Sequence, residues 1–432
     1  MRWPSFRVQL LICACLGGWL ALAGSSATSG SAGSASGSPA NEVSGAITVD
    51  TTWDKANSPY VVTGDVTVNP DVTLQIEPGV EVRFDGNYAL IARGALLAEG
   101  TSGQPIAFTS NQASPAPGDW AVIDIRADGQ YTLLRHVIVE YGGNSTRGGW
   151  GCAAGAICAN MAPFELDQSV VRHNATRGLV LVHSDATVSN NTFEEHPEEA
   201  ISLYGCDTRI GPCRPTIAGN RFTGNGSPIA RRSAQDPYLL GNQSSGNGTN
   251  GFVLSVCRFE GENVWHADLP YVIPGWCTIG GYGPAAISVE PGAVVKIDGG
   301  GLTIKTSAVL TATGTAEQPI VFTSFLDDSV GGDTNGDGDA TAPAANDYGH
   351  VSVTDAGTRA LFEHVVFRYG GSGRWGSGPN LWGDWDSTIV MHSCDLSLAE
   401  TGITVWRGAS LVLEDSLLHD LTYAGVHVDG EG

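Results

Sequence analysis

The chain has 432 residues, of which 58 are glycine and only 16% are charged. Lys and Arg number 22 against 45 Asp and Glu, a formal net charge of −23 at pH 7. Such an acidic surface repels nucleic acid, so we exclude nucleic acid as a partner. The acidic, glycine-rich composition fits an extracellular protein, and the length allows a large core or several small domains.

The first 23 residues predict a signal peptide. Arg2 and Arg7 precede the apolar run 8–22, and residues 21–23 (Ala-Leu-Ala) give the small-x-small pattern of a cleavage site. The run is shorter than the ~20 residues that cross a bilayer, so we expect no stable membrane span. Residues 24–42 are rich in Gly, Ser and Ala, as in a flexible linker. We therefore expect a secreted or cell-surface protein.

The remainder of the chain contains an internal duplication. The segment GALLAEGTSGQPIAFTS (94–110) matches AVLTATGTAEQPIVFTS (308–324), and LLRHVIVEYGGN (133–144) matches LFEHVVFRYGGS (361–372). The first pair is shifted by 214 residues and the second by 228. About 14 residues have therefore been inserted in the second copy, between Ser324 and Asp347.

The duplication predicts a module at 43–230, an irregular joining segment at 231–268 and a second module at 269–432. The chain stops near 425–432, where a strand begins, whereas the first copy continues at the equivalent place. This is the pattern expected if the second module is truncated and the chain is a fragment of a longer protein.

Each module contains short alternating segments that end at Gly, Pro, Asn or Asp, which predicts strands. The unit repeats at 22 residues, as from Val171 to Phe193 and from Leu396 to Leu418. A unit of this length cannot enclose a core alone, but stacked units share one. We find no convincing helical periodicity.

Residues 169–230 and 394–428 resemble the "xNxFxxNxxxGIxL" coils of right-handed parallel β-helix repeat proteins, and the opening segment resembles the first coils of exported bacterial members. The resemblance extends over about residues 50–430. It implies an all-β solenoid, a right-handed parallel β-helix of two duplicated modules. The alternative, two packed β-sandwich domains, fits a linker at 226–262 but not the 22-residue period. The fold hosts enzymes, adhesins and structural proteins, so it implies no single function.

Seven cysteines follow the signal peptide. In an oxidising compartment, six are expected to pair with sequence neighbours, although spacing leaves other connectivities open. The remaining Cys394 is expected to be a buried free thiol. The expected pairs are Cys152–Cys158, Cys206–Cys213 and Cys257–Cys277.

The insertion contains the most specific local motif, DTNGDGD, with oxygen ligands at Asp333, Asn335, Asp337 and Asp339. It resembles the first half of an EF-hand or dockerin calcium loop. The twelfth position is Ala344 instead of glutamate, so additional ligands would be needed. We expect a structural Ca²⁺ site, the alternative being a solvated acidic loop. The candidates for the additional ligands are Asp327, Asp328 and Asp347.

Three tryptophans, Trp375, Trp382 and Trp385, lie in one glycine-rich loop. Aromatic faces next to Asp and Asn suit the stacking of sugar rings, although the rings could equally pack the loop onto a coil. Trp150, in the equivalent loop of the first copy, and Trp406 are further candidates.

No catalytic residue is assigned. The acidic cluster around His196 (Glu194, Glu195, Glu198 and Glu199) is interpreted as solvated turn charges, and His136 and His364 as equivalent turn residues. Asp327 and Asp328 resemble the paired carboxylates of polysaccharide hydrolases but lack the companion motifs. The leading hypothesis is a non-enzymatic β-helix that binds glycan or another extracellular partner. The alternatives are a polysaccharide lyase or glycoside hydrolase, and a structural spacer in a longer surface protein.

Overall fold

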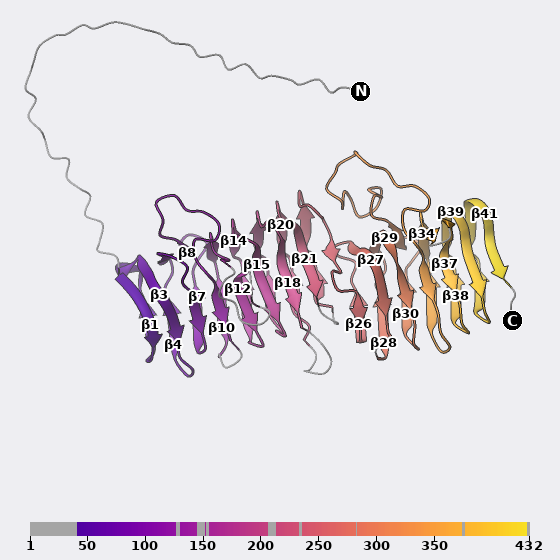
Figure 1. The fold of residues 1–432 in the computed structure, drawn as a ribbon. Helices are drawn as coiled ribbons and strands as arrows, with labels where there is room; N and C mark the ends of the chain where they lie inside the picture. Colours follow the sequence, from indigo (N-terminus) through magenta and orange to yellow (C-terminus); the bar gives the residue numbers. More distant parts are fainter. Residues whose placement is uncertain are drawn as a thin grey trace, which may run out of the picture. The chain divides into compact units, whose positions relative to one another are not determined.

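A computed structural model describes residues 41–126, 130–144, 152, 155–205, 213–232, 236–281, 283–373 and 376–429. Within these ranges the only helix is a single 3₁₀ turn, Lys55–Asn57, and short strands lie side by side from β1 (Asn41–Ile47) to β41 (Leu417–Asp429) (Figure 1). The strands of the three large sheets pair in parallel, each with the equivalent strand of the next coil. This arrangement is a parallel β-helix, and the alternative of two β-sandwich domains is wrong.

Each coil contributes strands to three faces. In the first module, face one is the eight-stranded sheet. Its strands are β2 (Thr51–Trp53), β4 (Thr73–Ile76), β7 (Ala95–Glu99), β10 (Thr132–Arg135), β13 (Phe164–Asp167), β16 (Thr187–Ser189), β19 (Thr216–Ala218) and β22 (Tyr238–Leu240).

Faces two and three of the first module belong to one larger sheet, because β3 (Tyr60–Val68) turns the corner between them and pairs with strands of both. Face two continues as β5 (Glu81–Phe84), β8 (Ile106–Ser110), β11 (Val137–Glu140), β14 (Val170–Arg172), β17 (Thr192–Glu194), β20 (Arg221–Thr223) and β23 (Gln243–Ser245). Face three continues as β6 (Leu90–Ala92), β9 (Ile123–Ile125), β12 (Gly155–Asn160), β15 (Arg177–Val182), β18 (Glu199–Tyr204), β21 (Ser227–Arg232) and β24 (Phe252–Val253).

The second module repeats this plan. Its face one is the six-stranded sheet, consisting of β26 (Gly261–Trp265), β28 (Ala285–Val289), β30 (Val309–Thr313), β33 (Arg359–Glu363), β38 (Thr388–His392) and β40 (Ser410–Glu414). Its faces two and three contain β25 (Arg258–Phe259), β27 (Tyr271–Ile279), β29 (Val294–Ile304), β31 (Ile320–Ser324), β32 (Val351–Val353), β34 (Val365–Arg368), β37 (Pro379–Gly383), β39 (Asp395–Trp406) and β41. A small antiparallel pair, β35 (Ser372–Gly373) and β36 (Gly376–Ser377), lies outside the coils.

The two modules are out of phase by one face where they meet. Strand β24 pairs with β21 on one side and with the first part of β27 on the other. By the duplication, the first part of β27 corresponds to the first part of β3, which belongs to face two. Face three of the first module therefore continues as face two of the second.

The core follows from the period of two in each strand, which sends alternate side chains inward. Equivalent inward positions stack from coil to coil, as where Phe193 and Phe222 lie in parallel with ring centroids 5.3 Å apart. Leu179 and Leu181 point inward from β15 and are buried. Because each coil shares this core with its neighbours, the 22-residue unit is stable only in a stack.

Buried polar ladders stabilise the turns of the first module. Between faces one and two, Asn191, Asn220 and Asn242 are hydrogen-bonded in series through their side chains at 3.0–3.1 Å. Between faces two and three, Asn225 and Asn247 are joined in the same way at 2.9 Å. Side-chain amides suit this position because each one both donates and accepts, which satisfies backbone groups that the core hides from water.

The insertion of the second module, residues 325–350 between β31 and β32, lies above the strands around β29 (Figure 1). The base of the insertion is held by the same pair of hydrogen bonds as the shorter loop of the first module. Asp347 accepts hydrogen bonds from the Ser324 hydroxyl and the Ala344 amide at 2.7 and 2.9 Å. Asp119 accepts the same pair of bonds, at 2.6 and 2.9 Å. The predicted insertion therefore extends a loop whose anchor is common to both modules.

The insertion reaches back to the last coil of the first module. The backbone amide and the side-chain amide of Asn250 donate to the carbonyls of Thr334 and Asp333 at 2.7 and 2.8 Å. Thr334 is fully buried, and Lys296 donates to the Gly332 carbonyl at 2.7 Å. The loop thus covers the place where face two of the first module ends.

Two of the predicted disulfides, Cys152–Cys158 and Cys257–Cys277, are present. Cys213 is disulfide-bonded, whereas its expected partner Cys206 lies outside the described residues. Cys394 is free and buried, as predicted. The described residues contain no helix that is long and apolar enough to cross a membrane.

Candidate functional site

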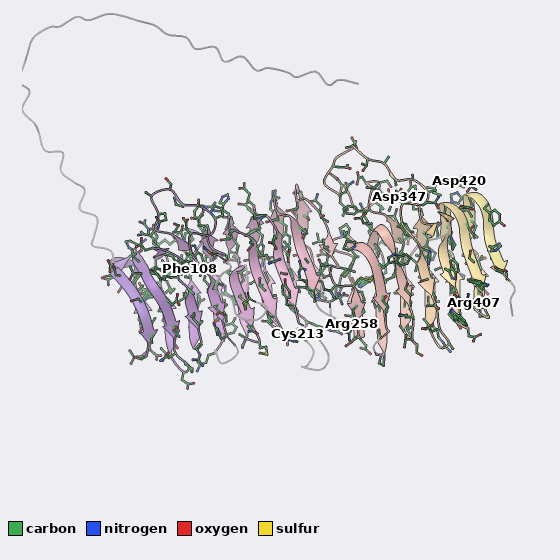
Figure 2. The ribbon with its side chains drawn as sticks, in the orientation of Figure 1. Phe108, Cys213, Arg258, Asp347, Arg407 and Asp420 are labelled. Carbon is green, nitrogen blue, oxygen red and sulfur yellow. A yellow bond between two sulfur atoms is a disulfide. The ribbon has the colours of Figure 1, made fainter. Side chains whose placement is uncertain are left out.

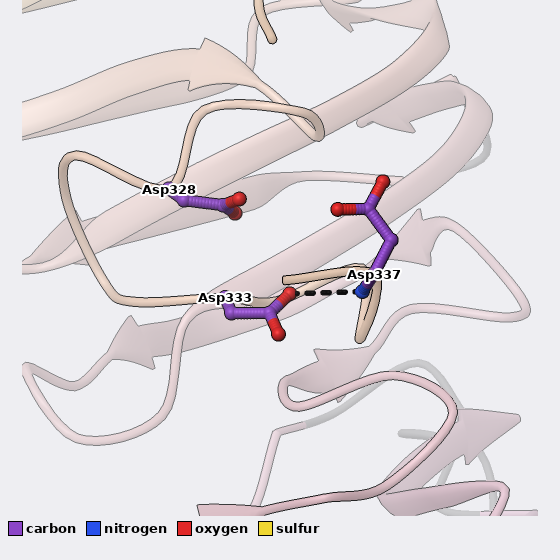
Figure 3. A group of neighbouring side chains, drawn as sticks. All are labelled: Asp328, Asp333 and Asp337. Atoms are coloured by element: carbon purple, nitrogen blue, oxygen red, sulfur yellow. Dashed lines mark hydrogen bonds between the residues drawn. The ribbon is translucent and has the colours of Figure 1, made fainter. Parts of the chain in front are cut away.

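Three carboxylates of the insertion lie close together. Oxygen atoms of Asp328, Asp333 and Asp337 all lie within 4.8 Å of one another, and the side chains face a common space (Figure 3). The Asp333 carboxylate also accepts hydrogen bonds from the amides of Gly336, Asp337 and Gly338, at 2.8, 3.1 and 3.0 Å. These bonds fold the DTNGDGD segment around Asp333.

The charge of this cluster is only partly compensated. Burial lowers the pKa of the enclosed Lys296 to about 8, opposed first by Asp328 and then by Asp327 and Asp333. Burial also raises the pKa of the Asp328 carboxyl, with Lys296 acting in the opposite direction. Three carboxylates and one ammonium group leave a formal charge of −2 (−3 + 1). A divalent cation has the charge that would balance it.

The donor atoms fit calcium. Asp328 Oδ1 and Asp337 Oδ1 are enclosed and have no hydrogen-bond partner among the described residues. An enclosed carboxylate oxygen without a partner is costly, and a hard cation that prefers oxygen ligands would satisfy both atoms. No sulfur or histidine nitrogen belongs to the group of three, which also favours Ca²⁺ over softer metals.

The predicted ligands are only partly brought together. Asp333 and Asp337 are in the cluster, whereas Asp339 is exposed and outside it. Asn335 directs its side-chain NH₂ group at Asp337 Oδ2, 2.9 Å away, and so acts as a donor in this arrangement. Of the three candidates for additional ligands, Asp328 joins the cluster. Asp327 and Asp347 have structural partners instead. Arg368 lies 2.6 Å from the buried Asp327, and Asp347 accepts the hydrogen bonds that hold the base of the insertion.

A second candidate site is a hollow of about 330 Å³ on the outer surface of face three in the second module. We call it the aromatic hollow. Its lining comes from the successive strands β37, β39 and β41. Six lining residues carry the chemistry, namely Trp382, Glu400, Trp406, Tyr423, His427 and Asp429.

Strand register produces this grouping. Trp382 pairs with Thr404, which pairs with His427, so the three side chains point outward from neighbouring coils. The ring centroids of Trp382 and Trp406 are 5.8 Å apart, and His350 lies 5.3 Å from Trp382 on the other side. Burial lowers the pKa of His350 to about 4. His350 is therefore a neutral ring at pH 7.

The tryptophans selected from the sequence have different surroundings. Only Trp382 is part of the hollow, and Trp150 and Trp375 lie outside the described residues. Trp385 is 53% exposed and lies under the guanidinium of Arg407, which also covers the ring of Trp406 at 3.9 Å. Arg407 lies at the edge of the stack opposite Asp347 and the insertion (Figure 2). Of the two tryptophans of this predicted site that the structure describes, Trp382 lines the hollow and Trp385 does not.

Sequence reasoning missed Glu400, Tyr423, His427 and Asp429. They come from two strands about one repeat apart, and no local motif connects them. The available signal was the 22-residue period, because aligning successive coils places Thr404 and His427 beside Trp382.

The interpretation of the cluster around His196 as solvated turn charges is wrong for His196 and Glu199, whereas Glu195 is exposed as expected. The His196 ring is fully buried and takes an asparagine position in the ladder between faces two and three. Its Nδ1 donates to Asn225 Oδ1 at 2.7 Å, and its Nε2 accepts from Asn174 Nδ2 at 3.2 Å. Among the nearby glutamates, Glu199 is also buried and pairs with Arg177 at 2.6 Å. These groups are structural, and not solvated.

His136 and His364 are turn residues, as predicted. Both adopt a positive φ, of 48° and 49°, between strands of faces one and two. Their carbonyls accept from equivalent amides, those of Ile106 and Ile320, at 3.1 Å.

Comparison with known families agrees with this architecture. Residues 45–146 match the pectate-lyase-like β-helix domain, and residues 154–264 match the right-handed β-helix region. The chain belongs to the right-handed parallel β-helix proteins. Both matches lie in the first module and the joining segment of this β-helix, so they do not include the insertion or the aromatic hollow.

Other comparisons add little to the β-helix assignment. A solved structure of a PL6-family alginate lyase, AlyGC, is 9% identical, with 84% of this chain and 73% of that chain covered. The TM-score is 0.22, so this likeness carries no argument about activity. The comparison with curated proteins gives no match.

Proposed function

We propose that this β-helix acts outside the cell as a glycan-binding protein without catalytic turnover, and that the aromatic hollow is its binding site. The observation that carries the proposal is the position of Trp382 and Trp406 on adjacent coils of one hollow. Indole rings provide flat apolar faces for sugar rings. The neighbouring carboxylates can accept hydrogen bonds from sugar hydroxyls, and the neighbouring hydroxyls can both donate and accept them.

The hollow also suits a polymer more than a small molecule. It spans three strands, and strands in one sheet lie about 4.8 Å apart. Trp276 and His350 extend the row of rings beyond the hollow, with centroids 5.6 Å apart. A chain of sugars could therefore lie across the coils and contact several of them.

The test is binding of the purified β-helix to a panel of soluble oligosaccharides, measured by calorimetry. The double variant Trp382→Ala, Trp406→Ala should lose about 100-fold in affinity, since a well-placed aromatic contact contributes about 1–1.5 kcal/mol. Trp385→Ala is the matched control, because Trp385 is 53% exposed but does not line the hollow. Unchanged binding by the double variant would refute this assignment of the site.

A second candidate function is polysaccharide cleavage. It is favoured by one observation, the convergence of Glu400, Tyr423, His427 and Asp429 in the same hollow. Carboxylates, imidazole and phenol are the usual acid and base groups of such reactions. Release of reducing ends or unsaturated products, lost in Glu400→Gln or His427→Gln, would replace the binding proposal with an enzymatic one.

We also propose that the Asp328–Asp333–Asp337 cluster holds Ca²⁺ in a structural role. The support is the uncompensated charge, the two enclosed oxygens without partners and the contacts of the loop with Asn250. Calcium would hold the insertion against the end of the first module. Its effect should then be on stability and not on the chemistry of the hollow.

A further inference from the structure

The charged groups of the aromatic hollow indicate which sugars it accepts. Glu400 and Asp429 line the hollow, and neither carboxylate has an ion-pair partner in the part of the chain that the structure describes. His427 is the only basic side chain among the described lining residues. The interior therefore favours a positive ligand and opposes a negative one.

The nearest strong cation does not change this balance. Arg407 covers one face of the Trp406 ring, but its guanidinium lies 3.8 Å from the Asp384 carboxylate and is compensated by it. His350, whose ring lies 5.3 Å from that of Trp382, is neutral at pH 7 because burial lowers its pKa to about 4. The long-range field has the same sign, since the chain carries −23.

The aromatic rings strengthen the preference. A protonated amine is attracted to the face of an indole ring, and Trp382 and Trp406 lie on the same hollow as the two carboxylates. A uronic acid would instead place its carboxylate next to Glu400 and Asp429. The like charges of these carboxylates would repel each other. No arginine or lysine lines the described hollow to pair with the carboxylate of the sugar.

We infer that the aromatic hollow binds glycans with free amino groups, such as a β-1,4-linked glucosamine polymer, and rejects uronate polymers. This inference rests on the proposed glycan-binding function. It makes Glu400 and Asp429 specificity-determining residues, with the tryptophans supplying the stacking common to all sugars.

The experiment compares four β-1,4-linked hexamers: glucosamine, N-acetylglucosamine, glucose and mannuronate. The first three differ only in the substituent at C2, whereas mannuronate has a carboxylate at C6 and an axial hydroxyl at C2. Binding is measured by calorimetry in a mildly acidic buffer that keeps the amine protonated and the carboxylates ionised. The glucosamine hexamer should bind about tenfold more tightly than the glucose hexamer, because exposed ion pairs and cation–π contacts each contribute up to about 1 kcal/mol. Mannuronate should bind most weakly, and added salt should reduce the glucosamine affinity alone.

Variants separate the hollow from the general acidity of the surface. Glu400→Gln with Asp429→Asn should remove the preference for the glucosamine hexamer over the glucose hexamer, because the amides still form hydrogen bonds with sugar hydroxyls but carry no charge. Glu414→Gln is the matched control, an exposed carboxylate on face one at β40. Trp382→Ala should weaken binding of the glucose and glucosamine hexamers alike.

The outcomes distinguish this inference from the proposal beneath it. Mannuronate binding as tightly as glucosamine, or glucosamine binding unaffected by Glu400→Gln with Asp429→Asn, would overturn the inference and leave glycan binding intact. Failure of all four hexamers to bind would overturn the proposed function and the inference together.

Discussion

The outer surface of face three is closed in the first module and open in the second. In the first, Cys158, Val180 and Val182 form a second apolar cluster with Ala121 and Cys152, outside the main core. In the second, Trp382, Thr404 and Trp406 line the aromatic hollow. In the later coils the two copies are shifted by 224 residues, as from Gly178 to Gly402. This shift makes Trp382 equivalent to Cys158, and Trp406 equivalent to Val182.

The interiors differ in the opposite sense. The amide of Gly142 is bound by Asn174, the first member of a four-residue ladder in the first module. The equivalent amide of Gly370 is bound by Asn380, which belongs to no comparable ladder within the described residues. In both copies an asparagine side chain accepts a hydrogen bond from this glycine amide, but the two asparagines do not occupy equivalent positions. The first module therefore has a buried ladder of polar side chains, and the second has polar and aromatic side chains on its outer surface.

The largest expected effect tests the ladder. Asn225→Ala removes the acceptor of the His196 amide and ring and the donor to the Phe193 carbonyl, all of them buried. Each buried group that loses its partner costs about 1–3 kcal/mol, so we expect a loss of about 4 kcal/mol in unfolding free energy. Asn380→Ala in the second module should cost about 2 kcal/mol. Urea denaturation of both variants measures this, and equal losses would contradict the contrast between the modules.

The next effect is on pH dependence. Burial lowers the pKa of His196 from 6.5 to about 4. Below pH 6.5 the unfolded chain takes up a proton that the folded ladder excludes, so the folded state loses stability until about pH 4, by about 3 kcal/mol in total. His196→Asn should remove this loss. Denaturation between pH 4 and pH 7.5 tests it, and a variant as acid-sensitive as the parent protein would refute the assignment.

A smaller effect is expected from calcium. A weak extracellular site at millimolar Ca²⁺ stabilises the folded state by about 1 kcal/mol, which corresponds to a melting-temperature increase of about 2 °C. Asp333→Asn with Asp337→Asn should abolish the difference between calcium and chelator, and Asp339→Asn should keep it. Dependence on Asp339 instead would favour the ligand set read from the sequence over the one in the fold.

The smallest effect concerns Trp385. Its ring is stacked under Arg407 and lies outside the hollow, so Trp385→Ala should change glycan affinity by less than about twofold. Trp406→Ala should reduce it by about tenfold. A large loss in Trp385→Ala would show that the binding surface extends around Arg407, as clustering in the sequence alone would suggest.

The fold was predictable because its information is local and repeated. Alternating strands, a 22-residue period and turn residues recur in every coil, so each repeat confirms the same interpretation. The neighbouring cysteine pairs 152–158 and 257–277 follow the same logic. The prediction for His196 failed because this histidine occupies a ladder position that asparagine takes in the neighbouring coils. In the sequence it is indistinguishable from a histidine in an exposed acidic turn.

The sequence by itself determined the parallel β-helix, its duplication and the insertion between Ser324 and Asp347. All three depend on spacing along the chain, which the sequence records directly. Only the tertiary structure decided the groupings of side chains. Asp328 joins Asp333 through the folding of the insertion, and Glu400 meets Trp382 and His427 because parallel register places successive coils side by side. Stacking thus brings distant residues into contact, and position along the chain cannot specify which of them will face a common space.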